Sequence, residues 1–237
     1  MKPILLIPFV LALPAFAGTP APITPAPQTP AEQGFTLGLE VMALQPYQAE
    51  GSYDKNDFDV AWRGSLGYQF NDGLFVKGTY FGYKTEIDND GCDLKTQYVD
   101  LVVGQHFHPM DKLTVSPFIG ARWASFQEWD KYVDFDGWGI VIGFDATRAL
   151  GNNISIYANA KTSVLFGTTK EAGESGKYDT TAFISEIGAG LQYDFCFSGV
   201  AGNVRAGVEG QYWSGVSDWD SEDTSLFGFV LGLNFRF

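Results

Sequence analysis

The sequence contains few cysteines, few basic residues and no long apolar run beyond residue 17, and each shortage excludes a class of protein. Its 237 residues include 2 Cys, and neither a CxxC motif nor a Cys/His cluster is present, which excludes a disulfide scaffold and a zinc site of the usual kinds. Fifteen Lys and Arg against 28 Asp and Glu give a net charge of −13. This acidity argues against nucleic-acid binding, which requires a basic face toward phosphate.

Glycine and aromatic residues are abundant in their place. The chain has 28 Gly, 20 Phe, 11 Tyr and 6 Trp, while its hydrophobic fraction is an ordinary 45%. This mixture favours β-structure with many turns over a helical bundle. The length is sufficient for one large all-β domain.

The N-terminal residues have the pattern of a secretory signal. Residues 1–17 (MKPILLIPFVLALPAFA) combine one basic residue, a short apolar stretch and an A-x-A site, which predicts a signal peptide cleaved after Ala17; a retained anchor is the alternative. Residues 18–33 contain five prolines, which predicts an extended periplasmic tether that acts as a spacer or binds a partner through its TPAP repeats. We assign residues 34–237 to the folded domain.

The folded domain has no run of 18 apolar residues, so a transmembrane helix is not expected. A mature chain that enters a bilayer must then close into a barrel, because lipid satisfies no backbone polar group. Most candidate strands reach the 9–11 residues or so that a tilted spanning strand needs. The predicted strands are 34–46, 59–70, 74–84, 96–108, 113–126, 137–148, 154–167, 181–195, 204–214 and 225–237.

The connections between these strands alternate in length. Short turns are predicted at 71–73, 109–112 and 151–153, with a slightly longer one at 196–203, and five longer polar loops alternate with them. This alternation is typical of outer-membrane barrels, which have short periplasmic turns and long external loops. The sequence therefore predicts an all-β, antiparallel, up-and-down transmembrane barrel of about 10 strands.

The last strand indicates which side chains face lipid. In SLFGFVLGLNFRF every second residue from Phe227 to Phe237 is apolar, and a terminal aromatic on such a strand behind a signal peptide is a mark of outer-membrane barrels, so Phe237 is predicted to be the assembly signal. With Phe237 outward, alternation orients the other strands. The predicted lipid face includes Leu39, Val60, Leu66, Leu101, Ile119, Ile140, Ile187 and Val208.

The opposite parity carries charge, which a soluble sandwich could not bury unpaired. Two interpretations remain open: these residues line a narrow polar pore, or they pair into a network that plugs a small barrel. The predicted lumen-lining residues are Glu40, Arg63, Lys77, Asp100, His106, Arg122, Asp145, Lys161, Glu186, Asp194, Arg205, Glu209 and Arg236.

All five long loops carry net negative charge, which predicts an acidic vestibule outside the membrane and a mild cation preference. The predicted vestibule residues are Asp54, Asp57, Asp88, Asp90, Asp130, Asp134, Asp218, Asp220 and Glu222.

Two smaller features receive structural interpretations. His106 and His108 lie on one face beside a predicted turn, where we favour polar residues of the barrel floor over a metal or acid–base site. Cys92 is expected in an external loop and Cys196 at a periplasmic turn, so no disulfide between them is predicted, because a disulfide needs Cα atoms within about 7 Å.

Four segments together resemble a known family: FTLGLEVMAL (35–44), LTVSPFIGARWA (113–124), GWGIVIGFDATRALGNNISIYANAKTSVLFG (137–167) and VRAGVEGQYWSG…FGFVLGLNFRF (204–237). They are similar to the Legionella-type major outer-membrane protein family of pore-forming barrels, across roughly residues 34–237. The Pro-rich stretch and the acidic loops are not part of that pattern. The resemblance implies a porin-like barrel.

We therefore expect an outer-membrane pore for small solutes or ions in a Gram-negative-type envelope. The alternative is a non-conducting barrel that displays acidic loops for adhesion or envelope stability. An enzyme is disfavoured because no catalytic constellation is apparent. No cofactor or metal is expected. The expected partners are outer-membrane lipid, the barrel-assembly machinery and small solutes or ions, and not nucleic acid.

Overall fold

The computed structural model describes residues 33–48, 57–87, 93–128, 133–170, 176–197, 200–216 and 223–237. The predicted signal peptide and the predicted tether, apart from its last residue, lie outside these ranges. The described ranges include no helix with the length and apolar character needed to cross a membrane. The strands are β1 (Gly34–Gln48), β2 (Asp59–Gln69), β3 (Leu74–Glu86), β4 (Asp93–Gln105), β5 (Phe107–Met110), β6 (Leu113–Glu128), β7 (Val133–Gly151), β8 (Ile154–Lys170), β9 (Tyr178–Phe197), β10 (Val200–Ser214) and β11 (Thr224–Arg236).

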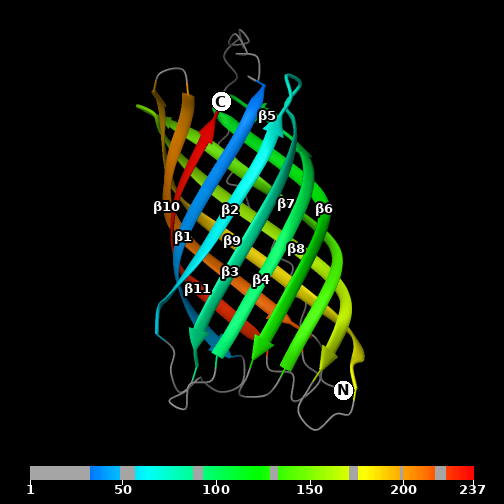
Figure 1. Ribbon diagram of the computed structural model, residues 1–237. Coiled ribbons are helices and arrows are strands. Elements are labelled where there is room, and N and C mark those ends of the chain that lie inside the picture. Colours follow the sequence, from blue (N-terminus) through cyan, green and yellow to red (C-terminus); the bar gives the residue numbers. More distant parts are fainter. Residues whose placement is uncertain are drawn as a thin grey trace, which may run out of the picture.

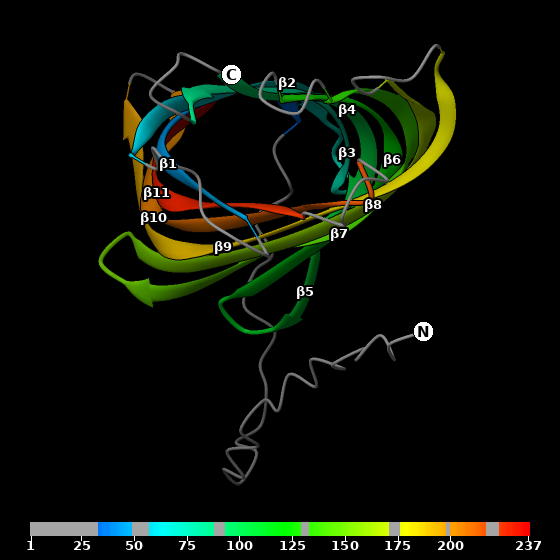
Figure 2. The ribbon, with the colours of Figure 1, turned by 90° about the horizontal axis from the view of Figure 1, so that it is seen from below.

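Ten of these strands form a closed antiparallel barrel (Figures 1 and 2). Each pairs with its neighbour along the chain, β1 pairs with β11, and β4 pairs with β6 across the short β5. Closure leaves none of the ten as a free edge, the condition for a sheet in lipid. The prediction of an up-and-down barrel of about 10 strands is confirmed, with β5 as one extra strand.

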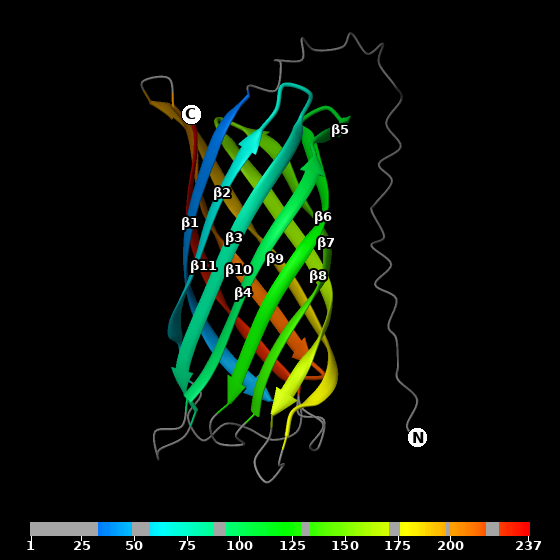
Figure 3. The same ribbon diagram turned by 45° about the vertical axis from the view of Figure 1, so that its right-hand side comes forward.

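The two ends of the barrel differ (Figure 3). The predicted tight turns lie at one end together with the C-terminus, and we call this the turn end. Gly73, Lys112, Asn152 and Asn153 have positive φ there, as tight connections require. The opposite end, where β1, β3, β6, β8 and β10 finish, is called the loop end.

The predicted strand 96–108 is wrong in one respect, because it divides into β4 and β5. The amide N–H of His106 donates to the carbonyl of Gly73 at 3.0 Å, which interrupts the ladder before β5 resumes pairing with β6.

The predicted loops 127–136 and 168–180 are partly strand, since β6 to β9 extend into them. Near the loop end the apolar side chains lie on the inward parity instead of the outward one. Phe126 and Phe135 point inward and are buried, while the polar Gln127 and Asp134 lie on the outward parity. The outward apolar pattern therefore stops before these strands end, and the predicted strand bounds are too short.

The outer wall has the apolar character predicted for the lipid face. Exposed side chains of this wall are Leu39, Val60, Leu66, Leu101, Ile119, Ile140, Ile187 and Val208. On the inner wall, large side chains lie over glycines of neighbouring strands. A Cβ at Gly104 would lie 2.4 Å from the Phe75 ring, so only glycine leaves room for that ring.

Candidate functional site

The barrel interior has three parts along its axis. An apolar core fills the loop end, a network of ion pairs crosses the middle, and a cavity of about 1960 Å³ occupies the turn end. We call them the apolar core, the central network and the turn-side cavity.

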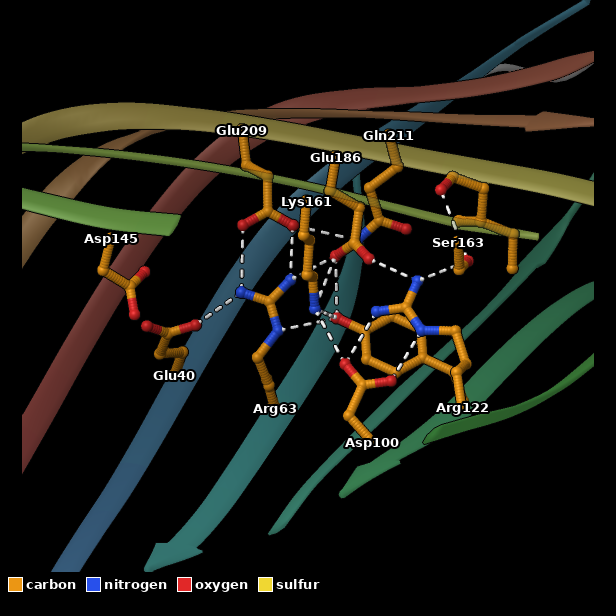
Figure 4. A network of polar contacts seen from close by, with 12 residues as sticks. Glu40, Arg63, Asp100, Arg122, Asp145, Lys161, Ser163, Glu186, Glu209 and Gln211 are labelled. Carbon is orange, nitrogen blue, oxygen red and sulfur yellow. Dashed lines mark hydrogen bonds and ion pairs between the residues drawn. The ribbon is translucent and has the colours of Figure 1, made fainter. Parts of the chain in front are cut away.

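Arg63 on β2 links its strand to four other strands within the central network (Figure 4). Its guanidinium donates to Glu40 Oε2 at 2.7 Å, to both Glu209 oxygens at 2.5 and 2.9 Å, and to Glu186 Oε2 at 3.3 Å. Its Nε also donates to the Tyr98 hydroxyl at 3.0 Å. Because Glu209 and Glu186 lie on β10 and β9, these bonds cross the lumen.

Arg122 on β6 is completely buried and holds the other half of the central network. It donates in bidentate fashion to Asp100, with Nε–Oδ1 2.6 Å and Nη2–Oδ2 2.7 Å. Its Nη1 lies 2.8 Å from Glu186 Oε1, in ion-pair but not hydrogen-bond geometry. Its guanidinium also lies 4.0 Å from the centroid of the Tyr98 ring, a cation–π contact.

Lys161 and Tyr98 connect the two halves. The ammonium of Lys161 lies 3.2 Å from both Asp100 and Glu186 and donates to the Tyr98 hydroxyl at 2.8 Å. That hydroxyl in turn donates to Glu186 at 2.8 Å. Three cations and four carboxylates thus form one network around the buried Tyr98 side chain. Figure 4 shows the charged side chains converging from opposite walls.

The apolar core lies on the loop side of this network. The rings of Phe126 on β6 and Trp213 on β10 are 6.0 Å apart, and these strands face each other across the lumen. Both side chains are buried, as are Phe81, Phe135 and Leu165 around them.

The turn-side cavity is polar and ends at the central network. Its inner end is lined by Glu40, Arg63 and Glu209, and its mouth by turn residues such as Asp72 and Lys112. It therefore opens toward the turn end and stops near mid-barrel.

The structure places all thirteen predicted lumen residues inside the barrel, some in buried pairs and others along the turn-side cavity. Asp100, Arg122, Glu186 and Glu209 are buried and paired, and Arg122 does not line the cavity. Lys77 and Asp145 form a looser pair at 3.5 Å, each about a third exposed. The remaining cavity-lining residues of the set are Glu40, Arg63, His106, Lys161, Asp194, Arg205 and Arg236.

Most of the predicted acidic vestibule lies outside the described residues. Of its members, Asp57 and Asp134 are described, and Asp134 accepts a hydrogen bond from Gln127 at 3.1 Å. The members outside the described ranges are Asp54, Asp88, Asp90, Asp130, Asp218, Asp220 and Glu222.

The smaller features are placed as follows. His106 Nδ1 lies 2.6 Å from Ser116 Oγ, and its ring stacks on Phe75. Among the described residues, no three His, Cys, Asp or Glu side chains lie close enough together to hold a metal. Cys196 is exposed with a free thiol, while Cys92 falls outside the described ranges. Phe237 is exposed, and its N–H donates to the carbonyl of Phe35 at 3.0 Å.

The sequence alone did not predict the apolar core. The signal was the row of apolar residues of inward parity near the loop-end tips, such as Phe126 and Phe135.

Comparisons with known proteins agree with this architecture. No curated protein sequence matches the chain. Among solved structures, the outer-membrane protease OmpT of Escherichia coli aligns with a TM-score of 0.53 and 8% identity over 88% of this chain and 98% of its own, which supports the fold alone. Neisserial surface protein A (TM-score 0.41, 16% identity, 87% and 99% coverage) and the translocator domain of NalP from Neisseria meningitidis (0.45, 12%, 86% and 89%) also align.

A family model settles the membership. The model described as the Legionella pneumophila major outer membrane protein precursor matches residues 28–237, which include every strand of the barrel. The chain belongs to this major outer membrane protein family, and its place is the outer membrane.

Proposed function

We propose that this protein is a closed barrel, which serves as a surface and envelope protein carrying acidic loops rather than as an open channel. One observation carries the proposal: ion pairs of the central network join opposite walls, as between Arg63 on β2 and Glu186 on β9. In barrels of about eight strands side chains fill the interior, and ten strands lie just above that limit.

The free energy of opening supports the same conclusion. A solute passing the middle of the barrel would have to separate Arg63 from Glu209 and Lys161 from Asp100. Breaking one buried ion pair costs about 3–5 kcal/mol, because a charge is left without compensation. The apolar core then presents a second barrier, because its aromatic and aliphatic side chains would not replace the water around an ion.

The second candidate is a porin-like pore for small solutes or ions, and the turn-side cavity favours it. This cavity already provides a polar path from the turn end to the central network. Conduction would then require the side chains of the network and the core to move aside. In that case the acidic loops would favour cations at the outer mouth.

Planar-bilayer recording of the refolded, full-length mature protein separates the two candidates. Folding is checked first by heat-modifiable migration in gels, and a conducting porin inserted under the same conditions shows that the assay registers channels. The closed barrel gives no stepwise current. Stable steps at low voltage would instead support the pore, and the reversal potential in a salt gradient would then measure its cation preference.

Two partner assignments accompany this proposal. The apolar outer wall contacts outer-membrane lipid, and the exposed terminal Phe237 is the signal for the barrel-assembly machinery. The likeness to a protease supports only the fold, and we propose no enzymatic activity.

A further inference from the structure

The turn-side cavity separates charged from neutral polar groups. The charged side chains that the long barrel strands contribute to its wall have partners, several of them neutral: Lys77 pairs with Asp145, and Arg205 donates to Gln192 at 2.8 Å and lies 5.1 Å from the Tyr157 ring. Asp194 accepts hydrogen bonds from Gln192 and Ser155. The cavity wall therefore offers little free charge to a ligand.

Neutral groups of the same wall have unused hydrogen-bonding capacity. Gln69, Asn159 and Ser65 line the cavity, and their side chains have no partner within the part of the chain that the structure describes. The amide of Asn234 donates to Asn203 Oδ1 at 3.0 Å, which leaves the other half of each carboxamide unused. These neutral side chains thus present both donors and acceptors to a ligand.

Glycines fix the position of several of these groups. A Cβ at Gly38 would lie 2.5 Å from both Asn234 Oδ1 and Ser65 Oγ, and one at Gly188 would lie 2.8 Å from Asn159 Oδ1. The polar side chains therefore lie flat against glycine positions on β1 and β9, and a ligand would find them already in place. Such preorganisation lowers the entropy cost of binding.

We propose that the turn-side cavity binds a neutral glycan, which enters from the turn end and stops at the central network. The inference rests on the proposed function only for that closed inner end. Sugar hydroxyls both donate and accept, so a glycan replaces the cavity water without leaving the carboxamides unpaired. A charged ligand would lose hydration and would have to compete with the existing ion pairs.

Isothermal titration calorimetry of the folded full-length mature protein tests this proposal. The probe is the tetramer of N-acetylglucosamine, with a hyaluronan tetramer as its anionic counterpart, and the detergent is an amine oxide because a maltoside would itself supply a glycan. We expect saturable binding of the neutral tetramer, at least about 10-fold tighter than that of the anionic one. Alanine at Asn159 or Ser65 should weaken binding about 5-fold each, the effect of one lost neutral hydrogen bond.

Matched controls lie on the outer wall. Thr162 on β8 and Ser185 on β9 form a hydrogen bond with each other at 3.0 Å, and both residues are exposed on the outer wall. Thr162→Ala and Ser185→Ala should therefore bind the probe as the unaltered protein does. No saturable heat at about 10 mM probe, undiminished binding by Asn159→Ala/Ser65→Ala, or tighter binding of the anionic tetramer would each overturn the proposal.

A second measurement tests the site even if the double variant fails to fold. Asn159→Cys in a Cys92→Ser/Cys196→Ser background places one thiol in the cavity. The neutral tetramer should slow its reaction with a small maleimide several-fold, and the anionic tetramer should not. Equal rates with and without the neutral probe would refute the site. Because neither readout measures current, failure here is distinct from failure of the closed-barrel proposal.

Discussion

Replacing Arg122 with methionine tests whether the central network holds the barrel together. The side chain is fully buried and forms two hydrogen bonds to Asp100 and an ion pair with Glu186. Methionine fills much of the same volume but leaves both carboxylates with reduced compensation. Breaking a buried pair in this way costs about 3–5 kcal/mol, or roughly 150- to 5000-fold in the folding equilibrium.

Unfolding in urea from lipid vesicles, followed by tryptophan fluorescence, measures that change. The matched control is Lys77→Met, because Lys77 lies 3.5 Å from Asp145 and both are about a third exposed. An exposed pair contributes about 0–1 kcal/mol, so this variant should unfold close to the unaltered protein. Adding Asp100→Asn to Arg122→Met should cost less than Asp100→Asn alone, since the shared pair is already broken.

Equal losses of stability in Arg122→Met and Lys77→Met would contradict this account. They would mean that burial and bidentate geometry add nothing to the pairing inside this barrel. Strict additivity of Arg122→Met and Asp100→Asn would contradict it as well, because residues in direct contact should couple.

Two further predictions concern the barrel wall and the turn end. A Cβ at Gly228 would lie 1.8 Å from the carbonyl oxygen of Ala43, whereas a Cβ at Gly210 would have no atom nearer than 3.9 Å. Gly228→Ala should therefore lower the yield of heat-modifiable barrel, and Gly210→Ala should not. Equal yields would show that the strands can separate at Ala43. Cys196 has an exposed thiol, so in a Cys92→Ser background the folded protein should react with maleimide at the rate of the urea-unfolded chain, and protection of more than about tenfold would mean that this turn is covered.

The outer wall could be predicted because one strand determines the rest. Six apolar residues at period two in 227–237 orient that strand, and the period of two carries the orientation through the antiparallel neighbours. The exposed side chains of Leu66, Ile140 and Leu231 show the result. The closed ring could be predicted because a strand with unpaired backbone groups is not stable in lipid.

The pairing inside the barrel could not be predicted in the same way. Arg63 and Glu186 are 123 residues apart, and Arg63 and Glu209 are 146 apart. Which inward side chains meet across the lumen depends on strand tilt and stagger around the whole barrel, and these are collective properties of ten strands. The sequence therefore supported a pore and a plug equally, and only the assembled register shows the crossing contacts.

The division of the interior follows from what lies outside each part of the wall. Around the central network the outward neighbours are apolar, such as Trp62, Leu101 and Ile187. Lipid there is as apolar as a core, so burying apolar side chains inside would gain little, and hydrogen bonds and ion pairs must supply the attraction between the walls. Near the loop end the outward neighbours are polar, such as Gln127 and Asp134, and apolar burial regains its driving force. The core and the network therefore occupy the levels where each is effective, and an apolar replacement should be tolerated better in the core than in the network.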